Sequence, residues 1–189
     1  MASVFPDCRW ALLGAAAIAT VGCGLSPVAA STLEDLRKLE NLINATGTQT
    51  VVSTECPPDH AGYYENDGQA VDRLVICQKM VDLADVEAVW EVMAHESTHI
   101  MQACRGSHVI DDAQMPRTVR QLQALAPHYA KLIGESYPTD EQRFETEAFW
   151  MELQPPARVI GLFRLHCGHF LTAPSTPVTA GGPRMGGER

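Results

Sequence analysis

The chain has 189 residues, of which 46% are hydrophobic and 20% are charged, which suits one globular domain with terminal extensions. Its formal net charge is −9, and the sequence contains no run of Lys and Arg. Because a nucleic-acid-binding protein needs clustered cations to neutralise phosphates, this composition argues against a nucleic acid as the partner.

The first thirty residues have the pattern of a secretory signal. Arg9 precedes an uncharged stretch over residues 10–22, and three small residues stand directly before Ser31, where a signal peptidase would cut. The uncharged stretch is short for a transmembrane anchor. A Thr-Val-Gly-Cys sequence ending at Cys23 offers the alternative of a lipid anchor. We therefore expect a signal peptide over 1–30 and a secreted or periplasmic protein with no stable membrane span in its mature form.

Removal of this signal leaves four cysteines, and an even number in an oxidising compartment predicts two disulfides. We favour Cys56–Cys77, which would brace the hairpin described below, and Cys104–Cys167. The alternatives are four reduced thiols or thiolate ligands of a metal. The C-x-x-C spacing that is common in thiolate zinc sites is absent from the sequence, which argues against the second alternative.

The mature chain is expected to begin with an amphipathic helix. Leucines and an isoleucine recur at helical spacing over 33–43, and Ser31 or Thr32 can cap the start. Gly47 can close the helix. Residues 48–53 are rich in β-branched side chains and are predicted to be extended.

A β-hairpin is expected next. Short strands at residues 63–64 and 74–77 flank a turn with Asn-Asp-Gly at 66–68. Cys56 and Cys77 bracket this unit. A disulfide between them would stabilise a hairpin that has few apolar residues of its own.

The central helix of the prediction follows the hairpin. Apolar residues at helical spacing run from Val86 through Ile100, with Asp82 or Asp85 as the cap and Gly106 as the end. Another helical stretch opens at Pro116, and Pro127 within it predicts a kink or two separate pieces.

The last helices are bounded by local signals. Thr139 and Gln142 have the spacing of a capping box, and the helix that they would start must end before Pro155. A short amphipathic helix over about 157–166 comes next. The chain after residue 171 consists largely of Pro, Gly, Ser and Thr, so we expect a folded domain over 31–171 and a disordered tail over 172–189.

The helix through residue 100 carries His-Glu-Ser-Thr-His at positions 95–99, an HExxH pattern. His95 and His99 are one turn apart on the same face, so both imidazoles can bind a single ion. Zinc with three protein ligands keeps one position for water, and Glu96 stands beside the first ligand, free to accept a proton from that water. The alternative is an accidental pair of histidines on a solvated helix face.

A third ligand must come from another part of the chain. Adamalysin-like enzymes place it six residues after the second His, where this sequence has Arg105, and Gln102 stands at their glycine position. The other common arrangement takes a Glu from a later helix. Glu145 and Glu147 are the two candidates.

With these residues the chain resembles the gluzincin-type (HExxH…E) zinc metallopeptidases in their small single-domain form, over about residues 60–150. In that family the ligand Glu precedes a small residue by three positions and often an Asp by four. Glu145 has Ala148 at the first spacing but Phe149 at the second. The family's Asp supports a ligand His, so another acid must do so here. The candidates are Asp82, Asp85, Asp111 and Glu147.

The resemblance implies an α+β fold, in which a small twisted sheet with its hairpin packs on the zincin-like motif helix and the Glu-bearing helix crosses beneath the zinc. It also implies that residues 71–77 form an edge strand that binds an extended peptide by strand addition. The expected protein is an exported zinc-dependent hydrolase, a metallopeptidase that cleaves a peptide or protein substrate, with His95, His99 and Glu145 as ligands of one Zn²⁺ and Glu96 as the general base. The alternatives are a catalytically inactive, exported zinc-binding interaction module and a disulfide-braced structural domain without metal.

A peptidase also needs an electrophile that stabilises the tetrahedral intermediate. The candidates for the electrophile are His128, Tyr129, Tyr137, His166 and His169.

The remaining histidines are not expected to bind a metal. A second metal site at residues 166–169 is disfavoured, because Gly168 is expected to break the helix there. His60 and His108 are interpreted as loop residues.

Overall fold

Helix α1 (Leu33–Ala45) opens the part of the chain that the computed structural model describes, residues 30–171. Its cap is Thr32, whose hydroxyl accepts the N–H of Asp35 at 3.2 Å while the Asp35 carboxylate accepts the N–H of Thr32 at 3.2 Å. This reciprocal pair is a capping box. The helix predicted over 33–43 is therefore confirmed. The expected signal, apart from its last residue, and the expected tail lie outside the described residues.

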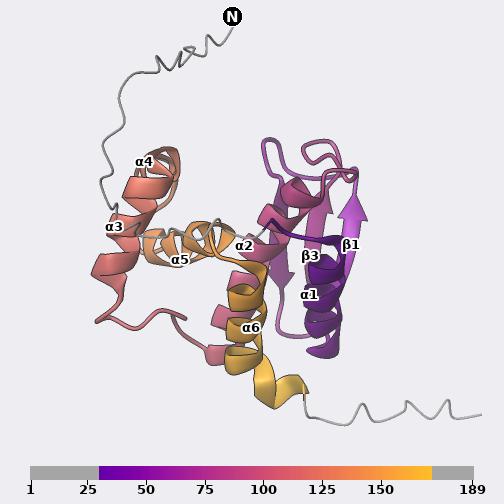
Figure 1. Ribbon diagram of the computed structural model, residues 1–189. Coiled ribbons are helices and arrows are strands. Elements are labelled where there is room, and N and C mark those ends of the chain that lie inside the picture. Colours follow the sequence, from indigo (N-terminus) through magenta and orange to yellow (C-terminus); the bar gives the residue numbers. More distant parts are fainter. Residues whose placement is uncertain (1–29, 172–189) are drawn as a thin grey trace, which may run out of the picture.

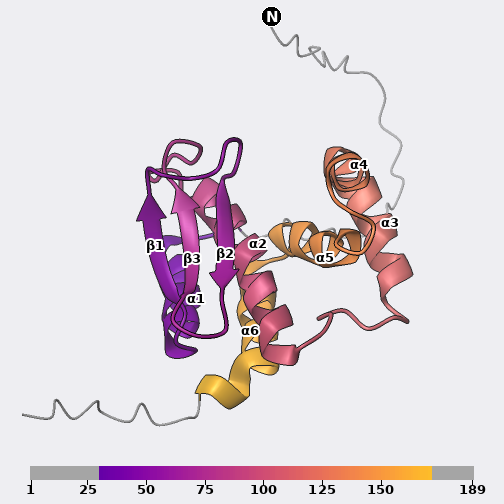
Figure 2. The ribbon, with the colours of Figure 1, turned by 180° about the vertical axis from the view of Figure 1, so that it is seen from behind.

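The sheet has the strand order β1-β3-β2, with β1 (Gln49–Ser53), β2 (Gly62–Asn66) and β3 (Asp72–Cys77) (Figure 2). The predicted hairpin is confirmed, because β2 and β3 pair in antiparallel fashion with Tyr63 opposite Val75. Strand β1 pairs with β3 in parallel on its other side.

Strand β3 is therefore the central strand, and the expectation that residues 71–77 form an open edge is wrong. The physical reason lies in the sequence of β3 itself. Its last four residues are apolar and are buried in succession. Such an unbroken apolar run is typical of a strand inside a sheet whose two faces are both buried. The edge that lies beside α2 belongs to β2.

Both predicted disulfides are present. Cys56–Cys77 ties the segment after β1 to the end of β3, and Cys104–Cys167 ties the end of α2 to α6. They close 21 and 63 residues of sequence, for which chain entropy alone predicts stabilisation of about 3 and about 4 kcal/mol. Two disulfides are compatible with an extracellular location.

Helix α2 (Val86–Arg105) contacts α1, α5, α6 and the sheet. Asp85 caps it by accepting the N–H groups of Glu87 at 3.0 Å and Ala88 at 3.3 Å. Gly106 ends it in the left-handed conformation, with φ at +68°, which favours glycine. The predicted central helix is thus confirmed, with Asp85 as its cap.

The remaining helices are α3 (Met115–Leu125), α4 (Pro127–Ser136), α5 (Gln142–Glu152) and α6 (Pro156–Leu171). The break predicted at Pro127 separates α3 from α4. The capping box predicted for α5 is wrong, because the backbone N–H of Gln142 donates to the carbonyl of Pro138, within the turn that precedes the helix. Helix α6 continues through Gly168, where the neighbouring Cys167 is buried and disulfide-bonded, so the expected end at residue 166 is also wrong.

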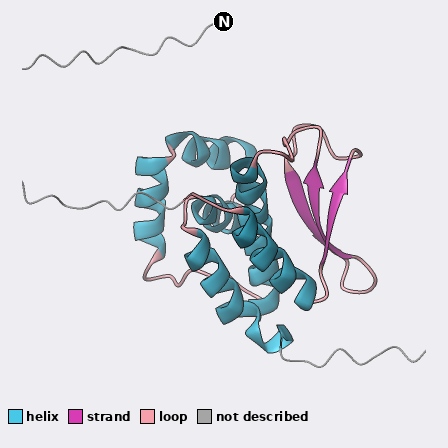
Figure 3. Cartoon of the chain, turned by 45° about the vertical axis from the view of Figure 1, so that its right-hand side comes forward, coloured by secondary structure: helices cyan, strands magenta, loops and turns pink. Residues whose placement is uncertain are grey.

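The helices lie on one side of the sheet (Figure 3). The main core joins the sheet with α1, α2, α5 and α6, and a smaller cluster joins α3, α4 and α5 around Phe149. Helix α5 crosses α2 between these two clusters (Figure 1). Among residues 30–171, no helix combines the length and apolarity needed to cross a bilayer.

Candidate metal centre

The three predicted ligands come together where α5 crosses α2. Nε2 of His95 lies 3.4 Å from Oε2 of Glu145, and Nε2 of His99 lies 3.6 Å from Oε1 of the same carboxylate. One ligand atom from each residue can be chosen so that all lie within 4.8 Å of one another. This group could hold a metal ion.

The spacing of these atoms can be compared with that of zinc ligands. Bonds of about 2.0–2.1 Å in a tetrahedral site separate the ligand atoms by about 3.3 Å, close to the distances between Glu145 and the two imidazoles. Oε2 of Glu145 is buried and has no hydrogen-bond partner. A buried carboxylate oxygen without a partner is costly, and a cation would satisfy it.

His95 is oriented by an acid that the sequence analysis missed. Its Nδ1 lies 2.6 Å from Oε1 of Glu152, at the end of α5, so Nε2 is the nitrogen that faces Glu145. Phe149, at the position of the family's Asp, instead packs its ring 4.6 Å from the His95 ring in an edge-to-face arrangement.

The acids suggested for this supporting role have other partners. Asp82 accepts the backbone N–H of Ala84, Asp85 caps α2, and Asp111 forms an ion pair with Arg105. Glu152 is seven residues after Glu145, and this spacing places both acids on the same face of α5.

His99 is oriented by Gln102, a second residue that the sequence analysis missed. Nδ1 of His99 lies 2.8 Å from Oε1 of Gln102, whose Nε2 donates to the carbonyl of Phe144 at 3.1 Å and to Glu147 at 3.0 Å. Both amide hydrogens of Gln102 are used, so its oxygen accepts the Nδ1–H of His99. Nε2 of His99 then keeps its lone pair for a cation.

Glu147, the alternative third ligand, does not belong to the metal-binding group. It is fully buried and accepts the backbone N–H groups of Val109 at 2.9 Å and Ile110 at 3.2 Å in addition to the Gln102 amide. Glu147 therefore holds the loop after α2 and reaches His99 only through Gln102.

Glu96 is buried beside the metal-binding group, with 6% of its surface exposed. Burial raises the pKa of Glu96 to about 7, although His95 and the backbone of Tyr64 lower it. Strand β2 approaches α2 closely here because residue 62 is glycine: a Cβ on Gly62 would lie 2.5 Å from Cγ1 of Val92. The glycine thus lets the strand lie against Glu96.

The charges of the group are coupled in the absence of a metal. Burial lowers the pKa of His95, but Glu145 and Glu152 outweigh this effect and raise it to about 10. Burial and the charge of His95 lower the pKa of His99. Burial by itself would raise the pKa of Glu145, but the two histidines lower this pKa by a larger amount, so the net shift is downward.

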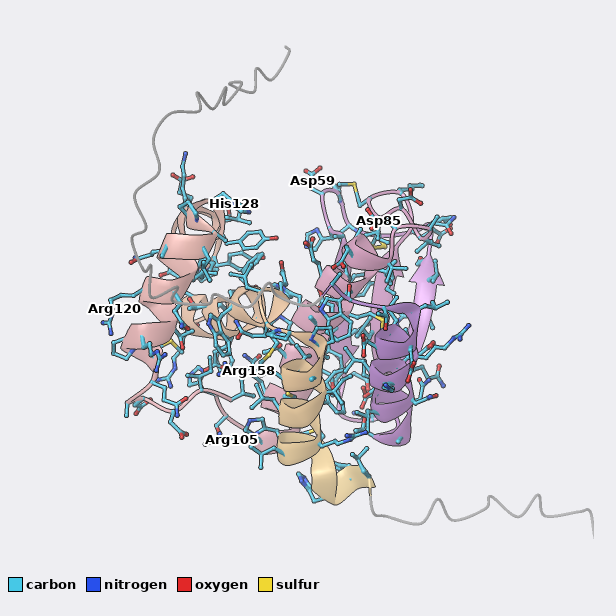
Figure 4. The ribbon with its side chains drawn as sticks, in the orientation of Figure 1. Asp59, Asp85, Arg105, Arg120, His128 and Arg158 are labelled. Atoms are coloured by element: carbon cyan, nitrogen blue, oxygen red, sulfur yellow. A yellow bond between two sulfur atoms is a disulfide. The ribbon has the colours of Figure 1, made fainter. Side chains whose placement is uncertain are left out.

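Two cavities flank the metal-binding group. One of about 520 Å³ is lined by His99 and Glu145, and the other, of about 480 Å³, is lined by His95 and Glu96 together with residues of α4. Asp59, from the loop before β2, lines the second cavity, whereas His128, on α4, lines neither cavity; Figure 4 shows both residues at the same end of the molecule.

Two of the five candidate electrophiles line the second cavity. These are Tyr129 and Tyr137. Burial raises the pKa of Tyr137 to about 12, with a further contribution from Glu145, so its hydroxyl stays protonated near neutral pH. His166 and His169 belong to α6 and line neither cavity. His60 and His108 lie in loops, as predicted.

Comparison of the chain with protein-family models, with curated proteins and with solved structures gave no match.

Proposed function

We propose that this protein is an exported zinc-dependent peptidase of the gluzincin type. In this proposal His95, His99 and Glu145 bind one Zn²⁺, and Glu96 is the general base. The observation that carries the proposal is the convergence of two Nε2 atoms on one carboxylate with Glu96 buried beside them.

The donor set favours zinc over calcium and magnesium. Calcium and magnesium prefer sites made only of oxygen atoms, whereas two imidazoles and one carboxylate suit zinc. A bound zinc ion with these three ligands would supply a water molecule of lowered pKa. Glu152 and Gln102 fix the Nδ1–H tautomers and leave both Nε2 atoms free to bind it.

The other residues have roles that follow from their positions. Glu96 accepts a proton from the attacking water and returns it to the leaving amine. Tyr137 lines the same cavity as Glu96, and its protonated hydroxyl can donate to the oxyanion that forms on the scissile carbonyl.

Strand β2 provides an edge for an extended substrate. At the two ends of β2, Cys77 donates its N–H to the carbonyl of Ala61, and Asp67 donates its N–H to the carbonyl of Val71, so odd-numbered residues are the ones that hydrogen-bond to the β3 side. In an antiparallel ladder the alternate residues, which include Gly62 and Tyr64, turn their peptide groups to the other side. We place the substrate along this side by strand addition, crossing both cavities and the metal-binding group.

The test compares wild type with Glu96→Gln in the chain that begins at Ser31. We expect both proteins to bind one zinc ion, and we expect hydrolysis of an unfolded protein substrate to fall by about 10²–10⁴-fold in the variant. Glu40→Gln, on α1, is the control with the same change in charge and should match wild type.

The two parts of the proposal fail in different ways. An unchanged rate in Glu96→Gln would refute the role of Glu96 as the base. Stoichiometric zinc in a wild-type protein that hydrolyses neither unfolded proteins nor a broad peptide mixture would support an inactive zinc-binding module instead.

A further inference from the structure

The residue that follows the predicted cleavage site is bound to the first turn of the motif helix. The backbone N–H of Ser31 donates to Oε1 of Glu87 at 2.8 Å, and the Ser31 hydroxyl donates to Oε2 at 2.7 Å. Ser31 and Glu87 are 56 positions apart in the sequence. One carboxylate thus accepts both polar hydrogens of the residue that would begin the mature chain.

The bond before Ser31 has the features of a cleavage site. Ala30 is exposed, and residues 30–32 belong to neither a helix nor a strand. The capping box of α1 begins with Thr32, so a cut before Ser31 leaves that helix and its cap whole. Small residues at 28–30 fit the specificity of a signal peptidase.

We propose that hydrolysis of the Ala30–Ser31 bond matures the protein and that Glu87 binds the new amino terminus. Water adds its oxygen to the carbonyl carbon of Ala30, the C–N bond breaks, and the nitrogen of Ser31 takes up a proton. At neutral pH the products are a carboxylate on Ala30 and an ammonium group on Ser31. The peptidase is supplied by the export machinery, and no other reactant is required.

Cleavage changes the nature of the Ser31–Glu87 contact. A neutral amide that donates to a carboxylate becomes an ammonium group that forms an ion pair with it, and such charge-assisted hydrogen bonds are stronger. Glu87 is favoured at this position because it lies in the first turn of α2, near the positive end of the helix dipole. The nearby Asp35 is occupied by Thr32, so Glu87 is the carboxylate that faces Ser31.

The ion pair would join the start of α1 to the start of α2, the helix that carries His95 and His99. This inference rests on the described contact and on the expected export of the protein. It depends on neither zinc binding nor hydrolysis, so it can fail or succeed separately from the proposed function.

The first test identifies the terminus. The full chain is expressed in a bacterium that exports it, and the exported protein is analysed by N-terminal sequencing and intact mass. We expect Ser31 as the first residue. An acylated chain that begins at Cys23, or any other start, would overturn the proposal.

The second test measures whether Glu87 binds the α-amine of Ser31. Near pH 7 an amine-reactive reagent modifies an α-amine in preference to lysine, because the α-amine has a lower pKa. In chains beginning at Ser31, we expect labelling to be about two- to fivefold slower in wild type than in Glu87→Gln, the range of an exposed ion pair. Glu40→Gln should label like wild type. Equal rates in wild type and Glu87→Gln would show that Glu87 does not bind the terminus.

A chain extended by Ala30 provides the last control. Its α-amine lies one residue away from Glu87, so its labelling rate should not change on Glu87→Gln. A dependence as large as that of the Ser31 chain would mean that a general surface charge effect, rather than docking of Ser31, sets the rate.

Discussion

Oε1 of Glu152 lies 2.6 Å from Nδ1 of His95, so the last turn of α5 orients the first imidazole of the metal-binding group. Glu152 and Glu145 lie on one face of α5, and both act on His95, one at each ring nitrogen. Support of this kind fixes the tautomer of a ligand histidine and its direction.

Loss of this support should weaken zinc binding without unfolding the protein. We expect Glu152→Ala to lower zinc affinity by about 10–100-fold, measured by competition with a chromogenic chelator. Glu152→Gln should lose less, because its amide oxygen can still accept the Nδ1–H of His95. Equal affinity in wild type and Glu152→Ala would contradict this role for Glu152.

Substitution of Glu145 and Glu147 should separate metal binding from stability. Glu147→Ala leaves the N–H groups of Val109 and Ile110 without a buried acceptor, so we expect it to lower the free energy of unfolding of the metal-free protein by about 3 kcal/mol. Glu145→Ala should abolish stoichiometric zinc binding, which Glu147→Ala should retain. Denaturant titrations and metal analysis measure both effects. The reverse pattern would make Glu147 the third ligand.

Zinc binding should release a proton. Burial lowers the pKa of His95, but Glu145 and Glu152 raise it to about 10, above the ordinary value of 6.5. Protonated His95 therefore stabilises the metal-free fold below pH 6.5, and this contribution is lost as the pH rises through 10. Zinc requires the neutral ring, so its affinity should increase with pH across this window. Calorimetry in two buffers of different ionisation enthalpy should show release of about one proton at pH 7, and no release would contradict the assignment of His95.

The cleft should favour basic substrates. Among the described residues, no Lys or Arg lines either cavity beside the metal-binding group. We expect peptides with Arg or Lys near the scissile bond to be cleaved about fivefold faster than matched peptides with Asp or Glu, and we expect the preference to shrink with salt. Glu91→Gln should reduce it. Faster cleavage of the acidic peptides would contradict this prediction. The acids that line the cavities are Asp59, Glu91, Glu96, Glu141, Glu145 and Glu152.

The sequence predicted the parts of the site that depend on local spacing. His95 and His99 are four residues apart on a helix, and the family resemblance pointed to Glu145. Glu152 and Gln102 were missed because their roles depend on how α5 crosses α2. The spacing of seven residues between Glu145 and Glu152 was a usable signal for the first of them.

The fold was predicted to a similar degree. The α+β class was implied by the family resemblance, the hairpin follows from its turn residues, and the disulfide pairing follows from four cysteines of which two bracket the hairpin. The parallel pairing of β1 with β3 joins segments separated in the chain by β2, and hydrophobic periodicity does not specify such pairing. The unbroken apolar run at 74–77 was the one local indication that β3 is central.

The capping box shows how tertiary context selects between equal signals. Thr32 and Thr139 both precede a suitable partner by three residues. Only Thr32 forms the box, because the turn at Pro138 already satisfies the N–H of Gln142.

The most direct test of the metal centre is a crystal structure of the zinc-loaded protein with diffraction data collected on both sides of the zinc absorption edge. We expect one strong anomalous peak about 2.0–2.1 Å from Nε2 of His95, Nε2 of His99 and a carboxylate oxygen of Glu145. A structure with no peak between these side chains, or with the zinc ion bound elsewhere, would contradict this metal site.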